Sequence, residues 1–309
     1  MKRYRDYNTY LREFFGERVQ KISIDAGFTC PNRDGSISTG GCIYCDPKGS
    51  GNGAMIQKNI PIEEQVLSGV KIARNRYRAK KFIAYFQSFT NTYAPVNILE
   101  NLYKKALSHE GVVGLSIGTR PDCMDKDILE LVYSFASDYL VWIEFGLQSS
   151  HDKTLERINR GHNRDAFKTA VKMTQKSGLN ICAHVILGLP GETREMMMET
   201  AEFLADQPIH GVKIHSLFVT EGTALAGMYR SGEFRCMERE EYTDTLIDFL
   251  ELLPPDYIIQ RVTGDPDRKN LLAPHWTLEK SKNMNHIRQR LEERDSWQGK
   301  KYRKPSAGK

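Results

Sequence analysis

Six apolar runs rich in β-branched and aromatic residues recur along the chain, at residues 19–25, 82–87, 112–118, 140–147, 181–187 and 212–219. Runs that are apolar at nearly every position are typical of parallel strands that are covered on both faces. The segments between them repeat apolar residues every three or four positions. This spacing predicts helices at residues 63–77, 96–107, 125–136, 164–178 and 194–207.

Strands that alternate with helices predict βαβ units and a parallel sheet, and therefore an α/β fold. Six such units are two fewer than a closed eight-stranded barrel requires. The pattern thus favours a partial, three-quarter TIM-type (β/α)6 barrel, with a doubly wound sheet as the alternative.

The pattern changes after about residue 225. A helical segment at 239–253 ends at Pro254-Pro255, and a charged helical segment follows at 277–295. We therefore expect a core barrel over residues 1–225 and a mostly helical extension over residues 226–309. The basic tail carries few apolar residues, so the last dozen residues are expected to be disordered.

The bulk properties limit the class of protein only loosely. The chain has 309 residues and a net charge of +5, which permits a nucleic-acid partner without requiring one. Two basic runs stand out, at residues 71–81 and in the tail from Trp297. The first suits the C-terminus of a helix, whereas the second, with Trp297 and Tyr302 among its cations, suits either RNA or a solvated tail. There is no apolar run of membrane-spanning length and no signal-peptide pattern, so we expect a cytoplasmic protein without a membrane partner.

Three cysteines, Cys30, Cys42 and Cys45, form the spacing C-x11-C-x2-C. Thiolates select zinc, copper(I) or iron–sulfur clusters, and a closed zinc site needs four ligands. Three thiolates fit a [4Fe–4S] cluster with one iron left open for a small molecule. The alternatives are a zinc site with a distant fourth ligand, or a disulfide. The remaining cysteines, Cys123, Cys182 and Cys236, are scattered and read as buried thiols.

Polar residues gather where the predicted strands end, which is where the chemistry of barrel folds is located. The candidates at these ends are Gln87, Ser88, Arg120, Glu144, Gln148, His184, Lys213 and His215, together with Arg160 in the segment INRGH. The cysteine loop follows the first strand, so it belongs to the same edge of the sheet.

The cysteine spacing and the polar segments at the strand ends make the chain resemble the radical S-adenosylmethionine (radical SAM) enzymes. Within these enzymes, it resembles the branch related to the catalytic subunit of Elongator. The resemblance rests on FTCPNRDG…GGCIYC, FQSFTNTYAP, GTRPDC, EFGLQS, INRGH, GLPGE and VKIHSL. It departs from the commoner C-x3-C-x2-C spacing of the superfamily, but long spacing is a property of the Elongator-like branch. The acetyltransferase domain of Elongator's catalytic subunit has no counterpart here, so that chemistry is not expected.

The resemblance implies two cofactors, a [4Fe–4S] cluster on Cys30, Cys42 and Cys45, and S-adenosylmethionine (SAM). It implies that Gln87 and Ser88 approach the SAM amino group and that Arg160 pairs with the SAM carboxylate, with an ion pair to Glu156 as the alternative for Arg160. Ribose contacts are implied for Gln148, Glu144 and His184, with structural burial as the alternative for Glu144 and His184. Lys213 and His215 are expected at the adenine edge or the substrate mouth, and Arg120 in the same cavity.

The function expected from the resemblance is one-electron cleavage of SAM to a 5′-deoxyadenosyl radical that abstracts hydrogen from a substrate. By analogy to Elongator, that substrate is expected to be tRNA at the C5 side chain of the wobble uridine. A flavodoxin or ferredoxin is expected to supply the electron. The alternatives are a radical SAM enzyme that acts on a small metabolite or protein, and an iron–sulfur or redox-sensing binding protein without turnover.

Overall fold

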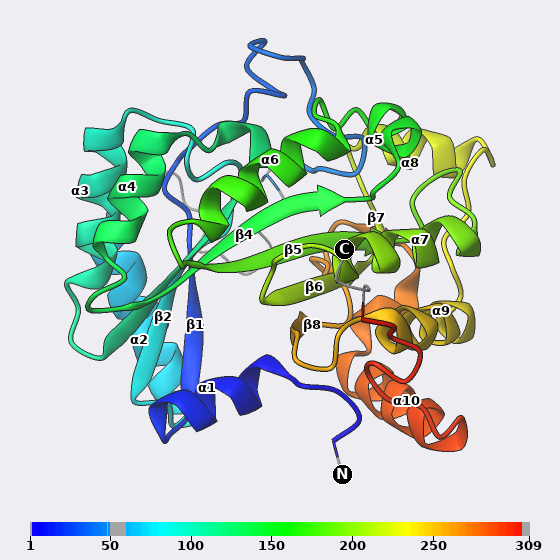
Figure 1. The fold of residues 1–309 in the computed structure, drawn as a ribbon. Helices are drawn as coiled ribbons and strands as arrows, with labels where there is room; N and C mark the ends of the chain where they lie inside the picture. The colour runs from blue at the N-terminus through cyan, green and yellow to red at the C-terminus, as the bar shows by residue number, and fades with distance from the viewer. Residues whose placement is uncertain (1, 48, 50–59, 305–309) are drawn as a thin grey trace, which may run out of the picture.

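The computed structural model describes residues 2–47, 49 and 60–304. Within these residues the core is one parallel sheet of seven strands, and their order in space follows their order along the chain. The sheet curves into a partial barrel with helices on its outer side (Figure 1). Its strands are β1 (Val19–Ile24), β2 (Lys81–Phe86), β3 (Val112–Thr119), β4 (Leu140–Gln148), β5 (Asn180–Leu187), β6 (Gly211–Ser216) and β8 (Ile258–Arg261).

The α/β partial-barrel prediction is confirmed, and the six expected strands are all present. The sheet also has a strand that the pattern did not predict, β8, which pairs in parallel with β6. Because β8 comes from the C-terminal part of the chain, the sheet continues across the boundary that we placed at residue 225. The core therefore needs both parts of the chain.

Helices join successive strands and cover the outside of the sheet. Several begin at side chains that cap the first turn: Asp125, Asn163 and Thr193 each accept a hydrogen bond from the backbone N–H three residues later. The described helices are α1 (Tyr7–Phe15), α2 (Ile62–Tyr77), α3 (Val96–Leu107), α4 (Lys126–Ser134), α5 (Asp152–Arg157), α6 (Arg164–Gln175), α7 (Arg194–Ala205), α8 (Ala224–Arg230), α9 (Arg239–Leu252) and α10 (Lys280–Glu293).

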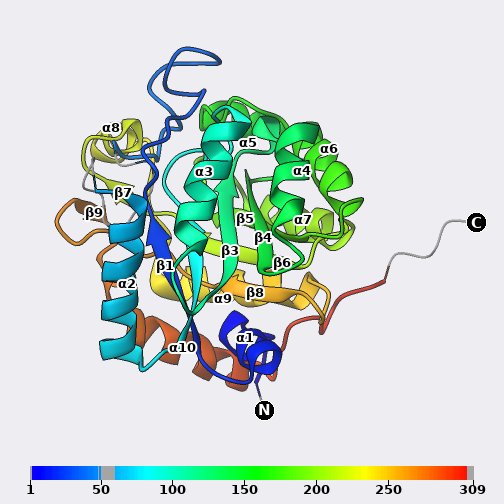
Figure 2. The ribbon, with the colours of Figure 1, turned by 90° about the vertical axis from the view of Figure 1, so that its left-hand side faces the viewer.

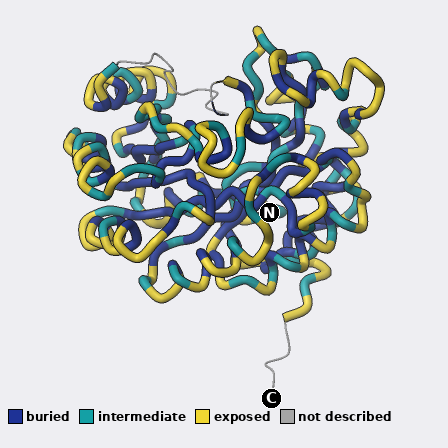
Figure 3. The backbone as a smooth tube through the Cα atoms, turned by 90° about the horizontal axis from the view of Figure 1, so that it is seen from above, coloured by how far each residue is buried: buried dark blue, intermediate teal, exposed yellow. Residues whose placement is uncertain are grey.

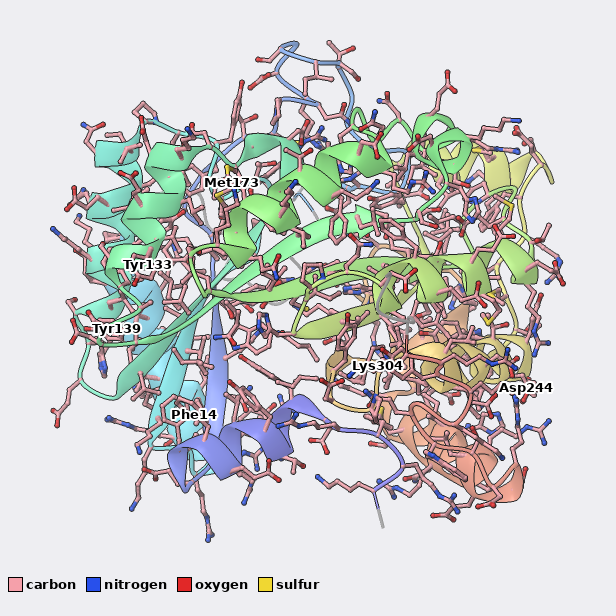
Figure 4. The ribbon with its side chains drawn as sticks, viewed as in Figure 1. Phe14, Tyr133, Tyr139, Met173, Asp244 and Lys304 are labelled. Carbon is pink, nitrogen blue, oxygen red and sulfur yellow. The ribbon has the colours of Figure 1, made fainter. Side chains whose placement is uncertain are left out.

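Most of the covering helices bury one side, whereas α9 is buried along almost its whole length. Seen from above, the strands are dark blue and buried at the centre, while exposed segments surround them (Figure 3). α9 and α10 lie side by side, because Asp244 of α9 forms ion pairs with Arg290 and Arg294 of α10 (Figure 4). Short strands β7 (Val219–Thr220) and β9 (Leu271–Ala273) form an antiparallel pair outside the main sheet.

Among the described helices, none combines the length and the apolar character needed to cross a bilayer.

Helix α1 closes the lower end of the partial barrel, opposite the loop that follows β1 (Figure 2). Tyr7 and Leu11 of α1 are buried against the barrel residues Trp142, Cys182 and Ile258. The rings of Tyr7 and Trp142 meet edge to face at 5.8 Å, a favoured geometry for aromatic pairs. The polar residues at the carboxyl ends of the strands therefore reach solvent at the upper end of the barrel.

The start of the C-terminal tail is ordered, so the prediction of disorder over the last dozen residues is wrong at Gln298. This side chain is 4% exposed and donates hydrogen bonds to the carbonyls of Pro254 (2.6 Å) and Tyr257 (2.8 Å). Its backbone N–H donates to the Arg3 carbonyl at 2.8 Å. Residues 305–309 of that prediction lie outside the described residues.

Candidate functional site

A single cavity lies at the C-terminal ends of the strands, where the cysteine loop covers the upper end of the barrel. Its lining includes the three cysteines of the loop and residues from β2, β4, β5, β6 and β8. Parallel strands bring their carboxyl ends to one edge, so residues far apart in the sequence meet there. The predicted residues in this lining are Cys30, Cys42, Cys45, Gln87, Arg120, Glu144, Gln148, Arg160, His184, Lys213 and His215.

Ser88 is the predicted residue that the structure places elsewhere. It is buried, its hydroxyl has no hydrogen-bond partner among the described residues, and it does not belong to the cavity lining. Gln87, directly before it, does line the cavity and accepts a hydrogen bond from the Ser23 hydroxyl at 3.0 Å. Ser88 and Phe89 form a bend after β2, and Phe89 has a φ of 59°, so the chain turns here and the Ser88 side chain does not reach the cavity.

The cysteine loop is held by its own turns. The Cys30 carbonyl accepts from Arg33 N–H at 2.8 Å, and the Cys42 carbonyl accepts from Cys45 N–H at 2.9 Å. The three cysteines are free thiols. In the described part of the chain, no group of three or more His, Cys, Asp or Glu side chains, the three cysteines included, is arranged to hold a metal ion. The loop brings the three thiols to the lining of one cavity.

Two side-chain donors face the sulfur of Cys42. Arg160 Nη1 donates to Cys42 Sγ at 3.6 Å, and Asn32 Nδ2 donates to the same sulfur at 3.7 Å. Hydrogen bonds to sulfur tune iron–sulfur clusters. These donors are therefore compatible with a [4Fe–4S] cluster on Cys30, Cys42 and Cys45.

Arg160 joins the cysteine loop to the end of β4. Its Nη2 donates to the Gly146 carbonyl at 2.7 Å. A Cβ at Gly146 would lie 2.7 Å from Arg160 Nη2 and from Gln148 Nε2, so a larger residue there would displace these two side chains. The ion pair with Glu156 that we considered for Arg160 is not formed in the structure. Instead Arg120 Nη1 donates to the Arg160 carbonyl at 2.7 Å, while its guanidinium forms a bidentate pair with Asp122.

Gln148 sits at an irregularity in the sheet. The pairing of β4 with β5 shifts register between Gly146 and Gln148, and Gln148 has a φ of 78°. A positive φ is uncommon for a residue with a side chain and is found preferentially at functional positions. The shift redirects the Gln148 side chain at the point where β4 enters the cavity.

Below the cysteine loop, a cluster of charged side chains surrounds Glu144. Its carboxylate accepts from Lys21 Nζ (2.5 Å), Lys213 Nζ (2.5 Å) and His184 Nε2 (2.7 Å). Tyr85 accepts a hydrogen bond from Lys213 at 2.9 Å. Glu144 is completely buried, so these partners stabilise a charge that would otherwise be costly.

The pKa values in this cluster follow from burial and from the neighbouring charges. Burial acts to raise the pKa of Glu144, but Lys21 and Lys213 outweigh it and hold the pKa well below its ordinary range. Burial, followed by the charge of Lys213, lowers the pKa of His184 to about 4. Burial and the charge of Arg261 also lower the pKa of His215. Burial also lowers the pKa of Lys213, and it lowers the pKa of Lys21 to about 8. At neutral pH the cluster therefore contains a carboxylate and two neutral imidazoles beside the two lysines.

Sequence reasoning missed three residues of this site. Lys21 was overlooked although it lies in a predicted strand, and a lysine inside an apolar run was a usable signal. Tyr85 looked like an ordinary core aromatic residue. Arg261 was missed because β8 itself was not predicted, and it lines the cavity from that strand.

The comparisons with known proteins agree with this geometry. Residues 32–204 match the model of the Radical SAM superfamily, and residues 209–293 match the Radical_SAM C-terminal domain. The chain is 39% identical over 303 residues to the protein YtqA of Bacillus subtilis, covering 97% of this chain and 92% of YtqA. It is 30% identical over 161 residues to the tRNA uridine(34) acetyltransferase of Methanocaldococcus infernus, covering 50% of this chain and 29% of that enzyme.

Among solved structures, the chain resembles the Elp3 protein of Methanocaldococcus infernus with an N-terminal deletion. The TM-score is 0.70 at 17% identity, and the match covers 91% of this chain and 64% of the archaeal one. A likeness at this identity establishes the fold. Together with the family match over more than half of the chain and the extended identity to YtqA, it leads to one conclusion: this chain belongs to the radical SAM superfamily.

Proposed function

We propose that this radical SAM enzyme binds a [4Fe–4S] cluster through Cys30, Cys42 and Cys45 and binds SAM in the cavity beneath the cysteine loop. The observation that carries the proposal is that the three cysteines line the same cavity as the ends of β2, β4, β5, β6 and β8. When bound, the cluster would supply the electron that cleaves SAM to methionine and a 5′-deoxyadenosyl radical.

The chain's own residues have separate roles in this proposal. Arg160 lies next to Cys42, so its guanidinium is placed to bind the SAM carboxylate. Gln87 and Gln148 line the cavity and offer amide groups to the methionine amino group and the ribose hydroxyls. The cysteine loop above them limits the entry of water, which protects a reactive intermediate.

Glu144 has a different role from the ribose contact that we first expected. Its oxygens already accept from Lys21, Lys213 and His184. A carboxylate with these three donors has little capacity left for ribose hydroxyls. We therefore assign Glu144 to the organisation of the cationic residues of the barrel interior.

We further propose that the substrate is tRNA and that the reaction modifies the C5 side chain of the wobble uridine. The support is the similarity to a tRNA uridine(34) acetyltransferase and to Elp3. It is joined by the shape of the site, because a buried cavity at the end of a barrel requires that the nucleotide leave its base stack. Single-stranded loops such as the anticodon loop present bases in this way.

The basic tail is less suited to the reacting nucleotide than the sequence indicated. Lys301 is paired with Glu251 of α9, and the tail begins beside Arg3, at the end of the strands opposite the cavity. Trp276, which precedes α10, donates its indole N–H to the Met237 carbonyl and packs on the core, so it is not free to stack on a base. The tail can therefore assist only with parts of tRNA that are remote from the site.

The decisive experiment compares modified nucleosides in tRNA from the wild-type strain and a strain lacking the gene, with complementation by wild type and by Cys45→Ala. We expect a precursor to accumulate at the wobble uridine in the deletion strain and in the Cys45→Ala strain. Cleavage of SAM by the purified protein with an unaltered nucleoside profile would overturn the tRNA assignment and favour a small metabolite or a protein substrate.

A further inference from the structure

One cation of the cavity lining forms no hydrogen bond or ion pair within the part of the chain that the structure describes. Arg261 on β8 lines the cavity. The other cations of the lining that the structure describes, Arg33, Arg120, Arg160 and Lys213, each donate at least one hydrogen bond. By contrast, no hydrogen bond or ion pair joins the Arg261 guanidinium to any described residue. Burying part of an arginine without a partner is unfavourable, so this position requires an explanation.

The neighbour of Arg261 in the sheet is also a cation. Lys213 on β6 and Arg261 on β8 are paired residues of adjacent parallel strands, and both line the cavity. Like charges on paired positions of neighbouring strands repel each other and destabilise the sheet. A local arrangement that lowers stability in this way is found preferentially at functional sites.

The charges of the barrel interior do not balance. Lys21, Lys213 and Arg261 supply three positive charges, and Glu144 supplies one negative charge that two of them already share. The imidazoles of His184 and His215 are in contact, with ring centroids 5.6 Å apart, and add no negative charge. The other acids of the lining lie away from this cluster: Asp46 is on the cysteine loop, and Asp265 stands at the exposed rim and is paired with Lys280. An anion entering the cavity would restore the balance.

From this arrangement we propose that Arg261, supported by Lys213, forms a subsite for an anionic group of the substrate, a carboxylate or a phosphate. The planar fork of arginine binds either group through two parallel hydrogen bonds. The subsite lies on β6 and β8, whereas Arg160 serves the SAM carboxylate beside Cys42. This inference deepens the proposed function, since it takes the cavity to be the place where substrate binds.

The surroundings of Arg160 and Arg261 also fit separate roles, one in binding the cofactor and one in binding the substrate. Arg160 is tied to Cys42 and to the end of β4, on the side of the cysteine loop. Arg261 lies near Tyr85, Lys213 and His215, whose pKa values its charge affects. Two separate fork-shaped cations allow two anionic groups to be held at once, one from the cofactor and one from the substrate.

The test uses the anaerobically reconstituted holoenzyme with saturating SAM. Inorganic phosphate and, separately, acetate are titrated by calorimetry at constant ionic strength into wild type, Arg261→Gln, Arg261→Lys and Arg268→Gln. Arg268 is an exposed arginine seven residues further on, outside the lining, and serves as the matched control. The anion that binds more tightly to wild type identifies the group that the subsite takes.

We expect Arg261→Gln to lose about tenfold or more in affinity for the preferred anion, the scale for removing a hydrogen bond to a charged group. The anion affinity of Arg261→Lys should lie between those of wild type and Arg261→Gln, because lysine keeps the charge but lacks the planar fork. The affinity of Arg268→Gln should match that of wild type. Equal affinities in Arg261→Gln and wild type, or no saturable binding of either anion, would overturn the proposal. An equal loss of SAM affinity in Arg261→Gln would assign the residue to the cofactor instead.

The outcome is separable from that of the tRNA proposal. Anion binding that depends on Arg261, together with an unaltered tRNA nucleoside profile in the deletion strain, would leave the subsite in place and assign it to another anionic substrate. An altered nucleoside profile without anion binding would support the tRNA assignment and remove the subsite.

Discussion

Arg160 Nη1 lies 3.6 Å from Cys42 Sγ, although 118 positions separate the two residues in the sequence. The contact fixes the cysteine loop, which is otherwise a surface segment, to the end of β4. It also brings the cation proposed for the SAM carboxylate next to a proposed iron ligand. Binding of cluster and cofactor is therefore expected to depend on the same side chain.

Replacing Arg160 by Ala should weaken SAM binding by about 1.5–3 kcal/mol, because the carboxylate loses a charged hydrogen-bond partner. Arg160→Lys should recover part of the affinity, since it retains the charge. The measurement is equilibrium binding of SAM to holoenzyme of known iron content. Arg157→Ala is the control, because Arg157 is exposed and pairs with Glu233. Wild-type SAM affinity in Arg160→Ala would remove the residue from the site.

The three cysteines of the loop should hold about four irons per chain after anaerobic reconstitution. Cys30→Ala, Cys42→Ala and Cys45→Ala should lose the iron–sulfur absorbance, measured together with iron and sulfide content. Cys123→Ala and Cys236→Ala should retain it, because burial raises the pKa of each of these thiols to about 12 and keeps them protonated. A full cluster in Cys45→Ala, or zinc as the native metal, would contradict the assignment.

Removing the charge of Glu144 should destabilise the fold strongly. In Glu144→Gln the ammonium groups of Lys21 and Lys213 would remain in the barrel without a counter-charge, which costs about 3–5 kcal/mol for a buried pair. Urea denaturation of the apoprotein measures the free energy of unfolding. Glu156→Gln, an exposed change on α5, provides the comparison. Equal unfolding midpoints for Glu144→Gln and wild type would show that the cluster does not stabilise the barrel.

The neutral state of His184 should make stability depend on pH. Burial and Lys213 lower its pKa from 6.5 to about 4 in the folded protein. Because the unfolded chain binds this proton at higher pH, the contribution of His184 is fully present above 6.5 and is lost as the pH falls towards 4. The unfolding free energy of wild type should therefore fall relative to that of His184→Gln between pH 6.5 and pH 5. A constant difference over that interval would contradict the prediction.

The tail needs substitutions rather than truncation. Gln298→Ala should lower the free energy of unfolding by about 1–3 kcal/mol, because it leaves the buried Pro254 and Tyr257 carbonyls without donors. Removing all residues after Asp295 would cause the same loss and obscure any effect on RNA. Lys304→Ala is the control for stability, since Lys304 is exposed. Equal stability of Gln298→Ala and wild type would show that the tail is dispensable to the fold.

The fold was largely predictable because the buried parallel strands appear in the sequence as apolar runs. β8 escaped detection for a physical reason: it is four residues long and includes the polar Gln260 and Arg261. Lys21 Nζ donates to Gln260 Oε1 at 2.8 Å, so these polar residues face the interior charge cluster, where an apolar pattern does not apply. Helix α1 was not predicted because its aromatic face packs on the lower end of the barrel, a surface that exists only once the strands have assembled.

The site was predictable as a set of residues but not as a network. Polar residues at strand ends, such as Gln87 and His184, could be located from the pattern alone. The partners of Glu144 could not, because Lys21 and Lys213 come from strands that are far from it in the sequence. Which side chains meet inside a barrel depends on the register of strands that are far apart in sequence.

The contact of the two chain ends beneath the barrel has a consequence for how the protein is made. Arg5 N–H donates to Gln298 Oε1 at 3.0 Å, and Ile259 N–H donates to the Arg5 carbonyl at 2.8 Å. These are contacts of very high sequence separation, which slow folding because a long stretch of chain must be closed first. The contacts of Gln298 can form only after residue 298 has been synthesised. We expect the nascent chain to leave Lys21 and Glu144 open to water until that moment.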